Sequence, residues 1–246
     1  MYNILKEVDN GSILYNKNDV YVGKSIEHYG EYQSEELKLF EEYVHPGDVV
    51  LDIGANIGTH TLWFSERVGD NGFVLAFEPQ RLVFQTLCAN MAINSRQNVD
   101  CKHMGVGDKQ EIVKVPPLNP DVENNFGGLW IDGHKEGEDV AICKIDDMGL
   151  NRLDFIKIDV EGMEPSVLLG GLQTINKLKP AIYMEVDREK NYELLNGIIT
   201  GLSYDVQMHT PSLHPSDSEM ENIFGDVVSL NALCLSRERK YNGAYN

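Results

Sequence analysis

The decisive stretch of this sequence reads Val49-Val50-Leu51-Asp52-Ile53-Gly54-Ala55-Asn56-Ile57-Gly58-Thr59. A short apolar run, typical of a buried strand, leads into a glycine-rich turn that opens a helix. Glycines let the backbone turn sharply and let a ligand approach where a Cβ would otherwise stand. The pattern predicts a strand–turn–helix unit that binds a ligand at its turn. An ordinary turn between a strand and a helix is the alternative.

The spacing of this turn indicates which ligand it favours. It reads D-x-G-x-x-x-G, whereas dinucleotide-binding enzymes carry G-x-G-x-x-G. An acidic residue just before the first glycine disfavours a pyrophosphate, because two negative charges would meet there. A nucleoside with an ammonium group and no phosphate fits better, and S-adenosylmethionine is such a ligand. We expect its amino-acid end to lie against the turn, at Asp52, Gly54, Asn56, Gly58 and Thr59.

A second acidic residue, Glu78, follows the next apolar run about 20 residues after the turn. An acidic side chain at this position reaches ribose hydroxyls in nucleoside-binding sheets, and ligands of open α/β sheets bind at the carboxyl ends of the strands. A solvated carboxylate at a strand end is the alternative, but the two features stand at the expected separation. The remaining residues that we expect around the nucleoside are Pro79, Met104 and Val106.

Apolar runs and amphipathic stretches alternate along most of the chain. This alternation predicts a Rossmann-like α/β fold, in which helices cover both faces of a seven-stranded, mostly parallel sheet. The predicted strands are Val49–Ile53, Phe73–Phe77, Val99–Val106, Asp154–Ile158, Ala181–Glu185, Tyr204–Met208 and Val227–Leu235. The predicted helices between them are Thr59–Val68, Leu82–Ile93, Glu164–Leu172 and Tyr192–Leu202.

The chain divides into three parts. Residues 1–31 contain two β-like pieces, Ser12–Tyr15 and Asp19–Gly23, and are predicted to form a small N-terminal β appendage. Residues 32–236 form the main domain, which begins with a helix opened by Ser34. This domain carries an insert, 107–150, with a hairpin of Glu111–Val115 and Val140–Lys144 around an irregular loop, and a second loop, 209–226. Long loops in a compact domain are usually functional. The tail, 237–246, is polar.

Three ionisable residues alternate with apolar ones in Phe155-Ile156-Lys157-Ile158-Asp159-Val160-Glu161-Gly162. The period of two places Lys157, Asp159 and Glu161 on one side of a buried strand, near its carboxyl end. Such groups are expensive to desolvate unless they are paired or used. We expect Asp159 to face the cofactor and to take part in catalysis with Glu161. Glu185 ends the neighbouring strand and joins them, and a structural lysine–carboxylate pair is the alternative.

Taken together, these motifs resemble those of the FkbM-type methyltransferase family. The matching residues are Leu51–Gly58, Phe77-Glu78-Pro79, Ile156–Glu164 and Val167–Gly171, of which Lys-x-Asp-x-Glu-Gly-x-Glu is the most distinctive run. The likeness covers roughly 45–235. It implies a class I methyltransferase fold and S-adenosylmethionine as the methyl donor. It also implies, more weakly, O-methylation of a sugar, a glycan or another small-molecule acceptor.

Transfer to an alcohol needs a base, because a neutral hydroxyl is a poor nucleophile. His209 follows a strand and has a pKa near working pH, so it and Asp159 are the candidate bases, with Glu161 and Glu185 holding the acceptor. A surface histidine is the alternative reading of His209. Lys157, Asn125 and Asn231 are the candidate acceptor-binding residues. The acidic cluster could instead hold a divalent cation that acidifies the hydroxyl, but no motif compels a metal.

Composition narrows the class of partners. The formal net charge of −18 disfavours phosphate backbones and anionic lipid, so we expect neither nucleic acid nor membrane as a partner. The four scattered cysteines suggest free thiols in a reducing compartment, and no targeting or transmembrane segment is evident, so we expect a cytoplasmic protein. The sequence leaves undecided whether the chain forms a homodimer. The alternatives to a methyltransferase are a nucleotide-dependent oxidoreductase and a non-catalytic nucleoside-binding protein on the same fold.

Overall fold

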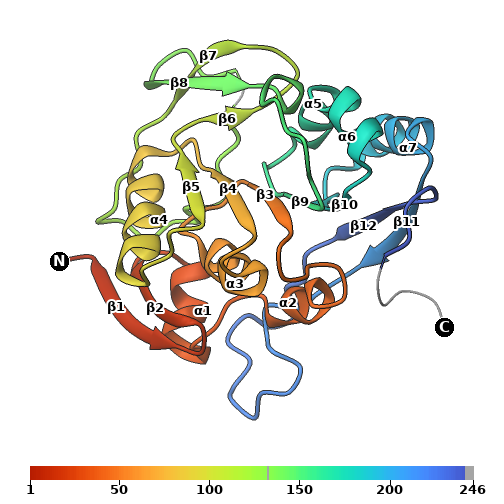
Figure 1. Ribbon diagram of the computed structural model, residues 1–246. Coiled ribbons are helices and arrows are strands. Elements are labelled where there is room, and N and C mark those ends of the chain that lie inside the picture. The colour runs from red at the N-terminus through yellow and green to blue at the C-terminus, as the bar shows by residue number, and fades with distance from the viewer. Residues whose placement is uncertain (132, 242–246) are drawn as a thin grey trace.

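A seven-stranded sheet forms the centre of the molecule (Figure 1). The structure, a computed structural model, describes residues 1–131 and 133–241. The strand order is β11-β12-β10-β9-β3-β4-β5, and only β12 runs antiparallel to its neighbours. The strands are β3 (Val49–Ile53), β4 (Phe73–Phe77), β5 (Val99–Lys102), β9 (Phe155–Ile158), β10 (Ala181–Glu185), β11 (Tyr204–His209) and β12 (Asn231–Ser236). The predicted fold class is confirmed.

Helices cover both faces of this sheet, because alternate residues of each strand point to opposite faces. Leu51, Ile156 and Ile182 pack under α5 (Glu164–Leu169), α6 (Leu172–Leu178) and α7 (Tyr192–Gly201). The other face packs under α2 (Ser34–Phe40), α3 (Thr59–Val68) and α4 (Arg81–Ile93). The predicted helix Glu164–Leu172 is therefore wrong in its extent, since the chain turns at Gly170 and Gly171 and starts a second helix.

A second, three-stranded sheet lies beyond the carboxyl ends of β4 and β5, at the top of Figure 1. Its strands are β6 (Gly105–Val106), β7 (Glu111–Val115) and β8 (Glu138–Cys143), in the order β6-β8-β7. The predicted hairpin of the insert is confirmed as β7 and β8. The predicted strand Val99–Val106 is wrong as a single element, because it breaks after Lys102 and β6 pairs with β8 instead of the main sheet.

The N-terminal residues fold onto the main domain. They form a hairpin of β1 (Asn3–Val8) and β2 (Gly11–Asn16), followed by α1 (Val22–Tyr29). The predicted strand at Asp19–Gly23 is wrong, because the Asp19 carboxylate accepts a hydrogen bond from the backbone N–H of Tyr21 and the chain then enters α1. The side chains of Asn90 in α4 and of Asn94, which caps the end of this helix, hydrogen-bond to the backbone of β2 and fix the hairpin against the domain.

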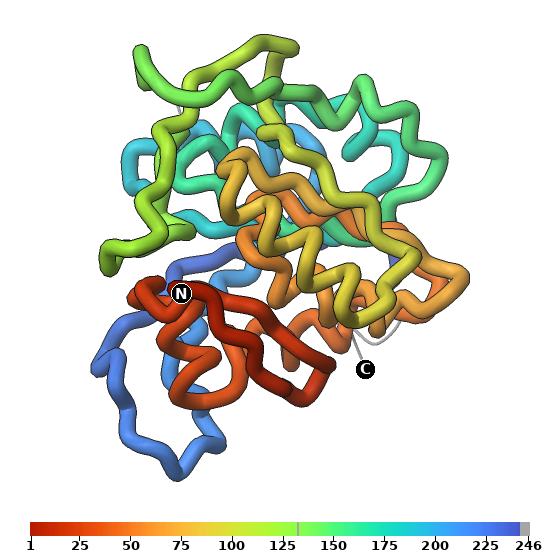
Figure 2. The backbone as a smooth tube through the Cα atoms, turned by 90° about the vertical axis from the view of Figure 1, so that its left-hand side faces the viewer, coloured from red at the N-terminus to blue at the C-terminus, as the bar shows by residue number. Residues whose placement is uncertain are grey.

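The C-terminal loop lies beside this N-terminal segment, as the tube in Figure 2 shows at its lower left. Tyr29 of α1 donates a hydrogen bond to the Glu221 carbonyl and accepts one from the Ile223 backbone N–H. The predicted strand Val227–Leu235 is shorter than expected, because residues 227–230 belong to this loop. Residues 242–246 of the predicted tail lie outside the described residues.

Two further sequence predictions concern chemistry outside the site. All four cysteines carry free thiols, as expected. No helix among the described residues is both long and apolar enough to cross a bilayer.

Candidate functional site

Two adjoining cavities open at the carboxyl ends of the central strands. The first is a mostly apolar pocket of about 450 Å³ between the main sheet and the three-stranded sheet. The second is a larger polar cleft, about 1100 Å³ including its open mouth, between the N-terminal segment, α2 and the ends of β10 and β12. Five residues line both cavities: Gly54, Glu78, Gly127, Asp159 and Glu161.

Gly54 brings the glycine-rich turn against the chain that follows β9. Its φ is +80°, and a Cβ at this position would overlap the carbonyl oxygen of Asp159. Gly127, from the insert loop, forms part of the same cradle, since a Cβ there would stand 2.7 Å from the Asn56 Nδ2 atom. Backbone therefore lines the junction of pocket and cleft where side chains would otherwise fill it.

Glu78 lies where the sequence places it, at the end of β4 and on the border of both cavities. Its Oε2 atom accepts a hydrogen bond from the backbone N–H of Asn56 (3.0 Å), and its Oε1 atom accepts one from Gln80 (2.8 Å). Each oxygen keeps a further lone pair for a ligand hydroxyl. Burial raises the pKa of Glu78 to about 7 in the absence of ligand.

Asp52 does not line either cavity. Its side chain is 0% exposed; it accepts a 2.6 Å hydrogen bond from the Thr61 hydroxyl and lies 3.7 Å from the Lys157 Nζ atom. Direct contact between Asp52 and the ligand amine, which the sequence suggested, does not fit this geometry. The carboxylate is buried because residue 52 faces α3 rather than the strand ends.

Lys157 is likewise buried, with 4% of its side chain exposed, and the predicted contact with the acceptor is wrong. Its ammonium lies 3.2 Å from Asp159 Oδ2 and 3.3 Å from the Gly54 carbonyl oxygen. Burial alone would lower the pKa of Lys157, but Asp159 and Asp52 outweigh it and raise the pKa above its usual range. Lys157 therefore holds the glycine-rich turn and the Asp159 segment together beneath the cavities.

Two other residues of the turn also lie away from the cavities. A Cβ on Gly58 would stand 2.5 Å from a Leu87 methyl, so this glycine lets α3 approach α4. Thr59 lines a separate hollow beside Leu62 and Trp63. Their assignment to the cofactor is corrected, because the helix turns both positions toward packing contacts. Asn56, with a φ of +51°, does line the cleft.

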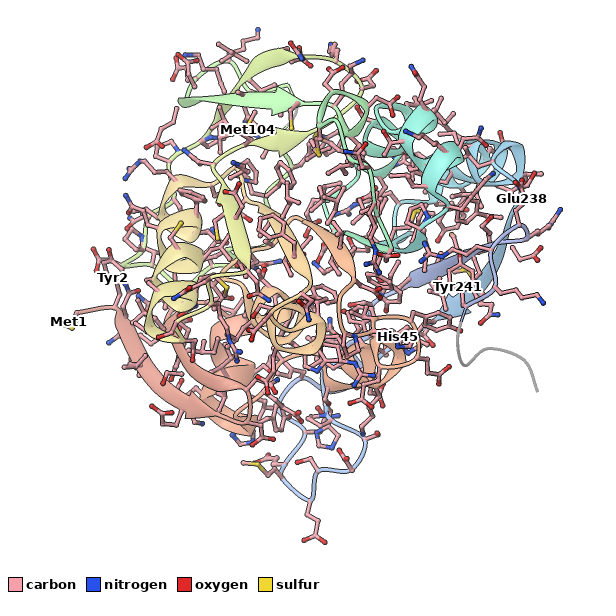
Figure 3. The ribbon with its side chains drawn as sticks, viewed as in Figure 1. Met1, Tyr2, His45, Met104, Glu238 and Tyr241 are labelled. Carbon is pink, nitrogen blue, oxygen red and sulfur yellow. The ribbon has the colours of Figure 1, made fainter. Side chains whose placement is uncertain are left out.

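The walls of the apolar pocket include Pro79, Met104 and Val106, the residues that the sequence analysis expects around a nucleoside. Figure 3 labels Met104 at the top of the main sheet, next to β6. The sequence did not single out Ile131 and Met163, which complete the wall opposite. Ile131 comes from the insert loop, where no local motif marks it. Met163 comes from the turn before α5, inside the run Ile156–Glu164, but at a position that the motif leaves unspecified.

Asp159, Glu161 and Glu185 converge in the cleft, with oxygen atoms that all lie within 4.8 Å of one another. Burial, together with the nearby Asp159 carboxylate, raises the pKa of Glu185 to about 9. Its Oε2 atom is buried and has no hydrogen-bond partner among the described residues. This spacing could accommodate a divalent cation, although Glu161 already pairs with Arg188 at 2.6 Å.

The predicted acceptor residues Asn125 and Asn231 both line the cleft. Asn125 accepts hydrogen bonds from the backbone N–H groups of Gly127 and Gly128, which shapes the insert loop over the site. Asn231 donates to Glu36 (3.2 Å).

His209 is not among the residues that line the cleft. It lies at the end of β11, one strand beyond β12, whose residue Asn231 lines the cleft. There its Nδ1 atom is hydrogen-bonded to the hydroxyl of Tyr183 at 2.8 Å. Burial lowers the pKa of His209.

Sequence reasoning missed the contribution of α2 to the cleft. Gln33 and Glu36 line it from the first turn of this helix, and both are buried. One signal was available: Glu36 stands one helical turn before the core residue Phe40, so it shares the buried stripe of the helix.

Comparison with known proteins agrees with this geometry. The family model described as "Methyltransferase FkbM domain" matches residues 52–226. The match is to a methyltransferase domain, and not to the nucleotide-dependent oxidoreductases that the sequence left as an alternative.

Two curated relatives are also methyltransferases by name. "Methyltransferase 1" of Beauveria bassiana is 24% identical over 208 residues, which cover 74% of this chain and 83% of the relative. "Hexuronic acid methyltransferase AglP" of Haloferax volcanii is 26% identical over 164 residues, covering 65% of this chain and 66% of the relative.

Solved structures share the fold. Methyltransferase FkbM from Methylobacillus flagellatus superposes with a TM-score of 0.51 at 19% identity, over 76% of this chain and 43% of that one. TYW2 of M. jannaschii, solved in complex with AdoMet, gives a TM-score of 0.50 at 13% identity, over 96% and 87%. At these identities the likeness concerns the fold alone, and the chain spans less than half of the solved FkbM protein.

Proposed function

Because this chain belongs to the FkbM methyltransferase family, we propose that it transfers the methyl group of S-adenosylmethionine to a hydroxyl oxygen of a sugar, glycan or other small polyol. The observation that carries this proposal is the junction of two unlike cavities. An apolar pocket suited to a nucleoside meets a polar cleft suited to a hydroxylated acceptor, and both share Gly54, Glu78 and Asp159.

The apolar pocket fits the donor. Met104, Val106 and Met163 offer apolar walls for a purine, and Glu78 offers lone pairs for the ribose hydroxyls at the pocket's inner border. The glycine cradle at Gly54 leaves room for the amino-acid end beside Asp159. The donor supplies an already activated methyl group, so the protein's main tasks are to orient the two reactants and exclude water.

The polar cleft fits a polyhydroxylated acceptor, since carboxylates and amides accept and donate hydrogen bonds to hydroxyl groups. It also carries a marked charge. Among the described residues, six carboxylates and one cation, Arg188, line it. Burial raises the pKa of Glu36, Glu78 and Glu185 to about 8, 7 and 9, so these three are partly or largely protonated near neutral pH. Asp159, Glu161 and Asp187 still outnumber Arg188. A carboxylate-bearing acceptor would meet repulsion from them, so we propose a neutral or amine-bearing acceptor for this chain, unlike the hexuronic acid in the name of the Haloferax volcanii relative. The six are Glu36, Glu78, Asp159, Glu161, Glu185 and Asp187.

The first prediction concerns the donor. Titration calorimetry with S-adenosylhomocysteine is expected to detect binding, and Glu78→Ala is expected to weaken it roughly 10-fold to 100-fold, because hydrogen bonds to a charged group are lost. Glu78→Gln retains the side-chain volume and separates loss of the ligand contact from loss of folding. The matched control is Glu66→Ala, an exposed carboxylate on α3 paired with Arg96, which should bind as the wild type does. Absence of any binding by the folded wild type would end the donor assignment.

The second prediction concerns the acceptor. A panel of neutral sugars, amino sugars and uronic acids is incubated with S-adenosylmethionine, and release of S-adenosylhomocysteine and mass gain of the sugar are measured. Methylation of a hydroxyl in a neutral or amino sugar is expected, with uronic acids at least about 10-fold poorer by kcat/KM. The panel is run with Mg²⁺ and with a chelator. Donor binding without methylation of any panel member would favour a non-catalytic nucleoside-binding protein, and a preference for uronic acids would contradict the charge argument.

A further inference from the structure

A chain of hydrogen-bonded side chains leads from the cleft through the sheet surface. It begins at Glu36 of α2, which lines the cleft and is 4% exposed. The Glu36 carboxylate is hydrogen-bonded to the hydroxyl of Tyr183 on β10. That hydroxyl is also hydrogen-bonded to the Nδ1 atom of His209 on β11, at 2.8 Å.

One end of this series of hydrogen-bonded side chains lies in the cleft, and the other end lies close to solvent. Glu36 faces the cleft in which the acceptor is proposed to bind. His209 stands at the end of β11, the edge strand of the main sheet, where its imidazole is only partly buried. Tyr183, between them, is fully enclosed at 2% exposure. This series of side chains therefore connects the cleft to solvent through groups that can each accept and release a proton.

A purely structural role explains this arrangement poorly. Asn231 already ties the Glu36 side chain to β12 through a 3.2 Å hydrogen bond, and Phe40 anchors the same helix in the core. A buried carboxylate, phenol and imidazole in series are costly to desolvate when their hydrogen bonds serve only to hold a helix. All three have hydrogen-bonding atoms that alternate between donor and acceptor when a proton moves along the series.

We propose that Glu36 accepts the proton of the acceptor hydroxyl and that Tyr183 and His209 pass it to solvent. This role rests on the proposed O-methyl transfer, whereas the connection of the three groups does not. Glu36 is then the catalytic base, and Tyr183 and His209 are relay residues that do not touch the acceptor.

Over one turnover, the proton taken from the acceptor reaches solvent, and the three side chains return to their starting state. In the resting state the Tyr183 hydroxyl donates to the Glu36 carboxylate, and His209 Nδ1–H donates to the Tyr183 oxygen. As the acceptor oxygen forms its bond to the methyl carbon and the carbon–sulfur bond breaks, the hydroxyl proton moves to Glu36. Once Glu36 is protonated, the partly exposed His209 ring exchanges its Nδ1 proton for a proton on Nε2 through solvent, and the Tyr183 hydroxyl turns to donate to the bare Nδ1 atom. Glu36 then protonates the Tyr183 oxygen, the Tyr183 proton moves to Nδ1 and the Nε2 proton leaves to solvent, which restores the start with one proton released.

Several charged and titratable groups surround Glu36 and set its pKa. Burial raises the pKa of Glu36 to about 8, with Lys157 of β9 lowering it and Asp159 and Asp52 raising it. His60 of α3 places its Nε2 atom 3.3 Å from Glu36 Oε2. Burial lowers the pKa of His60 well below its ordinary value, so it faces Glu36 as a neutral ring.

The relay is tested without any acceptor by NMR of protein labelled with ¹⁵N-histidine. Below about pH 8 a protonated Glu36 should turn the Tyr183 hydroxyl toward His209 Nδ1, and the imidazole proton should sit on Nε2. Above it, the imidazole proton should sit on Nδ1. A tautomer switch of His209 near pH 8 is therefore expected in the wild type, and it should vanish in Tyr183→Phe and in Glu36→Gln. His45, in the turn before β3 and labelled beside α2 in Figure 3, is the internal reference and should show no such switch.

The catalytic role is tested with the hydroxyl acceptor that turns over in the panel. Glu36→Gln, which retains an oxygen for the Asn231 amide, is expected to lower kcat about 100-fold or more and to remove the rise of kcat with pH through about 8. His209→Ala should lower kcat roughly tenfold with little change in KM, and added imidazole should restore it. His45→Ala is the matched control, and neither loss nor rescue is expected there.

The outcomes separate this inference from the proposed function. A single His209 tautomer across the pH range, or a switch that persists in Tyr183→Phe, overturns the relay even if methylation is observed. A loss of activity in His209→Ala that imidazole does not restore contradicts its role in proton transfer. A panel with no methylated acceptor contradicts the proposed function, while the NMR result still decides whether the three groups exchange a proton.

Discussion

Gly54→Ala is expected to abolish donor binding, weakening S-adenosylhomocysteine by about 100-fold or more. Gly54 lines both cavities with a φ of +80°, and the new Cβ would overlap the Asp159 carbonyl oxygen. Backbone atoms cannot rotate aside as a side chain would, so the turn and the Asp159 segment must separate at the junction where we propose that the donor binds. Strain of this kind costs on the order of 1–3 kcal/mol before any ligand contact is lost.

Gly47→Ala supplies the matched control. Its φ of +87° imposes the same conformational penalty, but a Cβ there would meet no atom within 4 Å. Denaturant unfolding followed by calorimetric titration should show mild destabilisation and unchanged binding for Gly47→Ala. If the two variants bind donor equally well, close approach at Gly54 is not what shapes the site.

Lys157→Met is expected to destabilise the fold by about 3–5 kcal/mol, because it leaves a buried carboxylate without its cation. Lys157 is the ammonium nearest to Asp52, whose side chain is fully enclosed, and it also ties the Gly54 carbonyl to Asp159. The measurement is the free energy of unfolding in urea, followed by circular dichroism.

Two further variants identify the cause. Lys114→Met removes a surface ion pair with Asp139, in which the two side chains are 40% and 64% exposed, and should change stability by less than about 1 kcal/mol. The double variant Asp52→Leu with Lys157→Met removes both buried charges and should recover much of the loss. A Lys157→Met variant as stable as the wild type would show that the buried pair contributes little.

Most of the fold could be predicted from local pattern. The apolar run of β3, the glycines after it and the amphipathic helix α3 are each specified by residues close in sequence, and their bounds agree with the prediction. Prediction failed where one segment had a choice of partners. The run 99–106 was predicted as one strand, yet it divides between two sheets because β8, distant in sequence, offers β6 a second edge.

The candidate site was predictable only in part. Glu78 and Asp159 could be placed at the strand ends because each follows a recognisable strand, whereas Asn231 was expected inside the strand that it in fact begins. Asp52 could not be assigned correctly, because a carboxylate that meets a ligand and one that meets a buried lysine look alike in sequence. Which of the two occurs depends on cross-strand register, which pairs Asp52 with Lys157.

The same limit applies to the proposed base. The sequence pointed to His209 as a residue able to move a proton, but the structure places it outside the cleft. Glu36, which does line the cleft, meets Asn231 across 195 residues of chain. That contact has no local signature.

The sequence alone determined the strand–turn–helix unit, the order of strands and helices, and the place of the acidic residue Glu78 at the carboxyl end of β4. These depend on periodicity and on turns, which neighbouring residues dictate. Only the tertiary structure decided which charges are buried in pairs and which face the cleft, and that α2 supplies a carboxylate to it. Those outcomes depend on which distant side chains share one enclosed space, since burial and pairing together set the charge of an ionisable group.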